Sequence, residues 1–209
     1  MGGSAEYREA HKQFQTTGFG HGTPGTGNGK GDDHFPVEAN VRIKEKTVDG
    51  ALAEFRKQHA NSDHEWAYVI DDQGYVHEYD EGDSSSVAVY NSRNGRVIHN
   101  HPTHGEPAFS YEDLELFAKQ QQKSITASSP KYDYTVERGT HFKKDEFVKA
   151  LSKAKLVGRD YNDAVHNWLL ANAGKYGYKY TRNTYKKDGS LGKTQKSTTL
   201  RKGKKQGKH

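Results

Sequence analysis

The chain contains the stretch His99-Asn100-His101-Pro102, and Ser110-Tyr111-Glu112-Asp113 follows it after seven residues. The run Arg96–Asn100 leads into this stretch and is predicted to be a β-strand. Side chains at alternate strand positions share one face, so the two histidines can bind the same ion. The proline ends the hydrogen-bonded ladder, which places both histidines at the end of a strand, beside a loop.

The carboxylate of Asp113 can complete a set of three ligands with the two imidazoles. Three protein ligands leave a fourth position open, which is typical of catalytic rather than structural zinc sites. Water at that position can lose a proton near neutral pH and attack a carbonyl. The same residues have a structural reading, since Ser110 with an acid three residues later is typical of a helix capping box. Both readings can hold together, because an acid in the first helical turn can project back toward the loop.

The patterns on both sides of this stretch predict a mixture of helices and short strands. A helix is expected from about Thr47 to His59, a second after Ser110, and two more over Phe142–Leu156 and Asp160–Ala173. Strands are expected at Glu65–Ile70, Tyr75–Tyr79, Val87–Tyr90, Arg96–Asn100, Ser124–Ala127 and Asp133–Glu137. This order of elements predicts an α+β fold.

The composition sets limits on the size of the core and on the type of protein. The chain has 209 residues, of which 31% are hydrophobic, and a mean hydropathy of −1.10, so we expect one modest core with flanking tails. No apolar run is long enough for a membrane helix or a secretory signal, and we therefore expect a cytoplasmic protein with no membrane contact. Without cysteine, any zinc must be held by histidine and carboxylate.

Charge is unevenly distributed along the chain. From Lys175 onward there are twelve Lys and Arg against the single acid Asp188, a net charge of +11, whereas residues 1–174 carry 20 basic and 26 acidic residues. We therefore divide the chain into a disordered Gly-rich leader (1–40), a catalytic domain (41–140), a helical extension (141–174) and a basic, disordered tail (175–209). Such a tail would attract nucleic acid or an acidic partner.

The two quoted segments together resemble the signature of the JAMM (JAB1/MPN+) metalloproteases, a group that includes deubiquitinating isopeptidases, their prokaryotic relatives and RadC-like proteins. The resemblance covers roughly residues 47–137 and continues upstream, where a predicted helix is followed by Asp63-His64-Glu65-Trp66 and a strand. It implies a cytidine-deaminase-like mixed sheet flanked by helices. It also implies a zinc ion held by His99, His101 and Asp113.

The resemblance further implies a peptidase or isopeptidase mechanism. Glu65 would move the proton from water to the leaving amine, and Ser110 would donate a hydrogen bond to the oxyanion. The substrate would be a peptide or protein. The short interval between Glu65 and His99 leaves open whether ubiquitin-like proteins are among the targets.

Three nearby residues offer alternatives or additions to this set. Glu78, on the predicted returning strand, competes with Glu65 for the acid/base role. His77 is interpreted as an exposed strand residue, and His104 as a solvated loop residue beside the site.

Three rival functions remain. The first is a non-catalytic JAMM-like or RadC-like scaffold that keeps the fold without the reaction. The second is an HNH nuclease, which the literal string His-Asn-His suggests, but those nucleases spread these residues over a ββα unit. The third is a binding module in which Tyr176, Tyr178 and Tyr180 stack on single-stranded nucleic acid, although an ordinary packed strand explains the same alternation.

Overall fold

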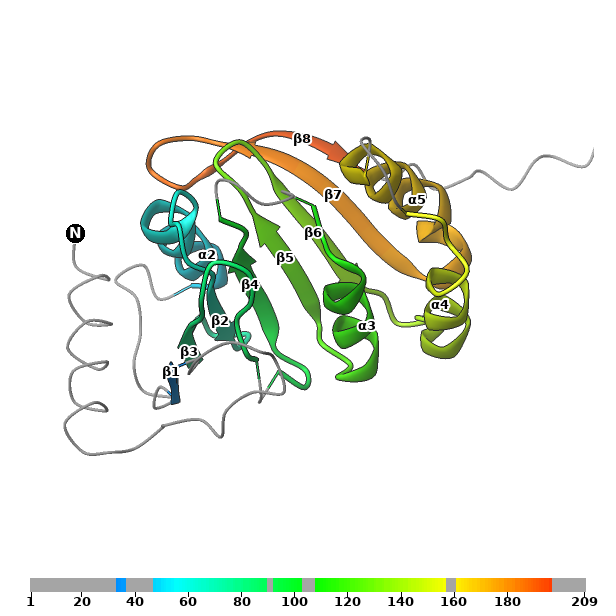
Figure 1. Cartoon of the computed structure of the whole chain (residues 1–209), viewed down its shortest axis with the longest axis horizontal. Coiled ribbons are helices and arrows are strands. Elements are labelled where there is room, and N and C mark those ends of the chain that lie inside the picture. Colours follow the sequence, from blue (N-terminus) through cyan, green and yellow to red (C-terminus); the bar gives the residue numbers. More distant parts are fainter. Residues whose placement is uncertain (1–32, 37–46, 90–91, 103–107, 157–160, 197–209) are drawn as a thin grey trace, which may run out of the picture.

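A parallel pair of strands lies at the centre of an eight-stranded sheet (Figure 1). β4 (Arg96–Asn100) and β5 (Ser124–Ser128) form this pair, and the other neighbours are all antiparallel in the order β1-β3-β2-β4-β5-β6-β7-β8. The structure is a computed structural model that describes residues 33–36, 47–89, 92–102, 108–156 and 161–196. Within these ranges the fold is α+β with a mixed sheet, as the sequence predicted.

The remaining elements follow the chain in a simple order. The strands outside the central pair are β1 (Asp33–Pro36), β2 (Trp66–Ile70), β3 (Val76–Glu81), β6 (Asp133–Arg138), β7 (Tyr178–Tyr185) and β8 (Leu191–Lys196). The helices are α2 (Val48–His59), α3 (Tyr111–Lys119), α4 (Lys144–Leu151) and α5 (Tyr161–Tyr176). None of the helices in the described ranges is long and apolar enough to cross a membrane.

Helices cover both faces of the sheet and create two hydrophobic cores. On one face, α2 packs Phe55 against Tyr68 and Ile98 of the sheet. On the other face, α3, α4 and α5 build the larger core around Phe117, Phe147 and Leu169. In β2 and β4, alternate residues enter the two cores: Tyr68 and Ile98 pack under α2, whereas Val69 and Val97 enter the larger core.

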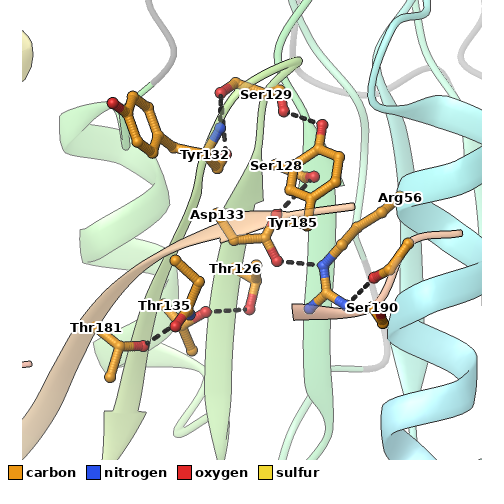
Figure 2. A network of polar contacts seen from close by, with 12 residues as sticks. Arg56, Thr126, Ser128, Ser129, Tyr132, Asp133, Thr135, Thr181, Tyr185 and Ser190 are labelled. Carbon is orange, nitrogen blue, oxygen red and sulfur yellow. Dashed lines mark hydrogen bonds and ion pairs between the residues drawn. The ribbon is translucent and has the colours of Figure 1, made fainter. Parts of the chain in front are cut away.

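A buried ion pair joins α2 to the start of β6 (Figure 2). Arg56 of α2 donates its Nε–H to Asp133 at the start of β6, and its Nη1 donates to the carbonyl of Gly189 at 3.1 Å. Ser128 donates a hydrogen bond to the other carboxylate oxygen of Asp133 at 2.8 Å. The guanidinium is 4% exposed and the carboxylate fully buried, so breaking the pair would leave an uncompensated charge in the interior.

The prediction of a disordered basic tail from Lys175 is wrong for residues 175–196. α5 continues to Tyr176, and β7 and β8 then extend the sheet as an antiparallel hairpin. Tyr176, Tyr178 and Tyr180 are at most 4% exposed and belong to the larger core, so they are not a platform for stacking bases. The prediction was based on the net positive charge of this region. Lys179 and the lysines of β8 occupy exposed strand positions, however, where charge does not oppose folding.

Three further sequence predictions need correction. Residues 141–174 do not form a separate extension, because α4 and α5 contribute Phe147, Val165 and Leu169 to the same core as α3. Residues 87–89 are not a strand. Of the predicted leader, residues 33–36 form β1, which pairs with β3, and the rest lies outside the described residues.

Candidate metal centre

The candidate ligands and acid meet because of the directions in which the central strands run. A parallel connection needs a crossover, so the chain leaves the end of β4, and α3 begins at that same end before the chain enters β5. His99 and His101 therefore lie beside Asp113 in the first turn of α3. β2 runs antiparallel to β4, which brings Glu65, just before β2, to the same edge. Ligands commonly bind at the carboxyl ends of the parallel strands in such sheets.

Each of three side chains offers a ligand atom, and these atoms lie within 4.8 Å of one another. The Nε2 atoms of His99 and His101 lie 3.0 Å apart. Asp113 Oδ1 lies 3.4 Å from His99 Nε2, and its Oδ2 lies 3.5 Å from His101 Nε2. In a tetrahedral zinc site with bonds of about 2.0–2.1 Å, neighbouring ligand atoms are about 3.3 Å apart. The three residues thus have the chemistry and the spacing to hold such an ion.

Asp113 also takes part in the capping box that the sequence predicted. The Ser110 N–H donates to Asp113 Oδ2 at 2.7 Å, and the Asp113 N–H donates to Ser110 Oγ at 3.0 Å. These two bonds fix the rotamer of the carboxylate and leave Oδ1 directed at His99. The Ser110 hydroxyl accepts one bond in this arrangement and keeps its own hydrogen for donation.

The surroundings of Asp113 hold its carboxylate in the charged form. Burial alone would raise the pKa of Asp113, but the charges of His99 and His101 and hydrogen bonds to both rings outweigh it. The net pKa lies well below its ordinary value. A permanently ionised carboxylate next to two imidazoles is the donor set that a divalent cation requires.

The pKa of Glu65 is shifted in the opposite direction from that of Asp113. Burial raises the pKa of Glu65, the charges of His99 and His101 lower it, and Asp113 raises it again, so that it lies above the ordinary value. Its backbone is clamped on both sides, because its N–H donates to the Asp83 carbonyl at 2.7 Å and its carbonyl accepts from Gly82 at 2.8 Å. A carboxyl group with a raised pKa next to the candidate ligands is suited to take up and release a proton.

Asn100 joins the histidine strand to the segment that carries Glu65. Its Oδ1 accepts from the Trp66 N–H at 2.7 Å, and its Nδ2 donates to the His64 carbonyl at 2.9 Å. The side chain is fully buried on the face opposite the histidines and forms hydrogen bonds with the backbone of His64 and Trp66, the two neighbours of Glu65. The sequence analysis assigned Asn100 no role. Its rarity in buried strands was the signal that could have identified it.

α5 positions the end of the loop that leads into α3. Asn162 Oδ1 accepts from the Ala108 N–H at 2.9 Å, and the Tyr161 hydroxyl donates to the Phe109 carbonyl at 2.8 Å. Phe109 is fully buried, with its ring centroid 6.4 Å from that of His99. No local sequence signal indicates these contacts, because the partners are more than 50 residues apart.

The candidate centre opens into a cavity of about 930 Å³. Glu65, His101, Ser110 and Asp113 line one part of it, and the rest lies between residues 84–87 and the outer side of α3. Apolar groups from Val87, Pro102, Ala108, Leu116 and Tyr161 contribute to its walls. A cleft of this size and mixed character can accept several residues of an extended polypeptide.

The alternatives from the sequence fall in different places. Glu78 is fully buried in the middle of β3, opposite Val69, and does not line the cavity. The side chain of His77 and the whole of His104 lie outside the described residues. Of the two candidate acids, Glu65 is therefore the one that the fold brings to the cavity.

Taken together, the arrangement can bind a divalent cation with two imidazoles and a carboxylate, and it has a second carboxyl group and a hydroxyl within the same cavity. It therefore has the groups needed for metal-assisted hydrolysis. Comparison of the chain with protein-family models, with curated proteins and with solved structures found no match.

Proposed function

We propose that this protein is a zinc-dependent hydrolase of JAMM/MPN+ type that cleaves a peptide or isopeptide bond. The observation that carries the proposal is the cluster of His99, His101 and Asp113, whose candidate ligand atoms lie within 4.8 Å of one another, at a cavity lined by Glu65, His101 and Asp113. The order of these residues along the chain matches the JAMM motif described above. Zinc bound there would supply an acidified water and a polarised substrate carbonyl.

The protein's own groups divide the remaining work. Glu65 accepts a proton as water attacks the carbonyl carbon and delivers it to the leaving nitrogen, a role that its raised pKa favours. Ser110 donates its hydroxyl hydrogen toward the oxygen on which negative charge develops. Asp113 remains ionised throughout, because the capping bonds and the two imidazoles stabilise its charge.

The cavity leaves room for a polypeptide substrate beside the candidate centre. It continues from the candidate centre along α3, past Glu112, Glu115 and Lys119, and faces the serine-rich segment 84–86. An extended chain in this cleft would place one backbone carbonyl at the centre and its neighbouring side chains against Leu116 and Val87. Whether the scissile bond is a peptide or an isopeptide bond is a question for the substrate screen.

The test combines metal analysis with a screen of peptide and isopeptide-linked substrates on the zinc-loaded protein. Glu65→Gln should retain one zinc per chain and lose activity by at least about 100-fold, the usual contribution of a general acid/base. Asp63→Asn is the matched control, because it removes an exposed carboxylate from the same segment and should leave turnover unchanged. Full turnover by Glu65→Gln would refute the assignment of the acid, and zinc binding without any turnover in the screen would favour the scaffold reading.

A further inference from the structure

A second cavity, of about 560 Å³, lies at the opposite end of β4 from the histidines. It is separate from the candidate metal centre and shares none of its lining residues. Four of its lining residues are cationic and one is acidic. The lining consists of Arg96, Gln121, Lys123, Glu137, Arg138, Gly139, Thr140, Phe142 and Lys144.

The cavity is built by the ends of three neighbouring strands. The Lys123 N–H donates to the Gly95 carbonyl and the Arg138 N–H donates to the Lys123 carbonyl, each at 2.8 Å. These bonds hold Arg96, Lys123 and Arg138 at the ends of adjacent strands, which are about 4.8 Å apart in a sheet. Their cationic groups are therefore gathered by the backbone rather than by chance proximity of flexible side chains.

The positive charges of this cavity are only partly neutralised. Arg96 and Lys123 share a single carboxylate, that of the exposed Asp72. Arg138 donates to the neutral amide oxygen of Asn94 at 2.9 Å. Glu137, the one acid of the lining, pairs with Lys179 outside the cavity at 3.8 Å, so positive charge remains in the cavity, as an anion-binding site requires.

The start of α4 adds to this potential. α4 begins at Lys144, which lines the cavity, and its N-cap residue Lys143 makes no side-chain capping bond. The acids of its first turn offset part of this potential, since Asp145 lies 3.5 Å from Lys144 and Glu146 lies 3.3 Å from Lys143. Uncapped amides at a helix start carry a partial positive charge that favours anions.

We propose that this cavity binds a phosphate-bearing ligand. Guanidinium groups form paired hydrogen bonds with phosphate oxygens, and lysines add point charges. The volume suits a ligand of nucleotide size, and Phe142 provides an apolar surface beside the charges. The phosphate can belong to a free small molecule or to a nucleic-acid strand, and the two sources differ in how they respond to competition.

Fluorescence anisotropy of a labelled single-stranded oligothymidylate, at low salt and with chelator present, tests this site in the full chain. Calorimetry with inorganic phosphate and AMP tests the small-molecule source. Arg138→Gln should weaken binding of the probe about fivefold to tenfold, since it removes a charge-assisted contact. Lys144→Gln, at a half-exposed side chain, is a second variant that does not threaten folding. Lys187→Gln changes the net charge equally at an exposed position outside the cavity and should change affinity less than twofold.

The results distinguish the source of the phosphate and can also refute the proposal. Binding of the oligothymidylate alone assigns the phosphate to nucleic acid, and binding of AMP or phosphate assigns it to a small molecule. Absence of binding by all three probes, or equal weakening by Arg138→Gln, Lys144→Gln and Lys187→Gln, would overturn the proposal. His99→Ala should leave binding unchanged, so failure of the proposed zinc chemistry does not affect this result.

Discussion

Zinc should stabilise the fold through the three candidate ligands, and replacing one of them should remove most of that stabilisation. The perturbation is His99→Ala, which deletes a ligand that is 3% exposed and whose Nε2 lies 3.0 and 3.4 Å from its partners. An ion that binds the folded state stabilises it by about 2.7 kcal/mol when its free concentration is about 100 times Kd. For a chain of this size, that corresponds to a rise in Tm of about 5–11 °C.

The variant should respond much less to the same zinc concentration. If losing one of three ligands weakens binding about 100-fold, the stabilisation falls to about 0.4 kcal/mol, or a rise of about 1–2 °C. The assay is thermal unfolding followed by circular dichroism in zinc-buffered and chelator-containing solutions. The quantity compared is the zinc-dependent increment in Tm, so any effect of the substitution on the metal-free fold cancels.

His141→Ala is the matched control, because it removes an exposed histidine that belongs to no ligand cluster among the described residues. It should keep the full increment. The reasoning fails if His99→Ala retains the increment of the unmodified protein, or if the unmodified protein shows none with zinc or another divalent cation.

Three other perturbations test the parts of the fold around the centre. Asn100→Ala should lower the free energy of unfolding by about 1–3 kcal/mol and reduce turnover while zinc is retained. The reason is that two part-buried backbone groups beside Glu65 lose their hydrogen-bond partner. Equal zinc content with unchanged turnover would contradict this. Asp133→Asn should lower the free energy of unfolding, measured in urea, by about 3–5 kcal/mol, since it leaves the guanidinium of Arg56 buried without its counter-charge. A loss of less than about 1 kcal/mol would show that the pair is not buried in solution. Burial lowers the pKa of His59 to about 3, below its value of 6.5 in the unfolded chain. The free energy of unfolding should therefore be highest above pH 6.5 and fall by about 1.4 kcal/mol per pH unit down to about pH 3. His59→Gln should flatten this slope, as measured by urea titrations at several pH values.

The elements that the sequence predicted well are those with strong local signals. The strand Arg96–Asn100 and the capping box at Ser110 were both identified, because β-branched runs and N-cap chemistry act within a few residues. The convergence of His99, His101 and Asp113 followed from strand alternation and from the position of the helix start. These inferences needed no knowledge of the rest of the sheet.

The parts that the sequence predicted badly depend on distant contacts or on misread charge. The hairpin of β7 and β8 carries its own local signal, Asp188-Gly189, where the glycine adopts a φ of +81°. The net charge of that region outweighed this signal in the prediction, although the lysines lie on exposed positions and the tyrosines fill the core. Asn162 could not be linked to the site from the sequence, because 54 residues separate it from Ala108.

The contribution of α5 to the candidate centre has a consequence for how the protein can be divided. Tyr161 and Asn162 fix the backbone at Ala108 and Phe109, directly before the capping serine, and the same helix fills the core beneath α3. β7 covers that helix with Tyr178 and Tyr180, and the Tyr178 hydroxyl donates to the Leu169 carbonyl at 2.8 Å. Truncation after residue 140, which the motif alone would justify, would therefore remove the support of the loop that sets Asp113 against the histidines. The candidate centre depends on the fold up to at least β7, even though its five key residues lie between Glu65 and Asp113.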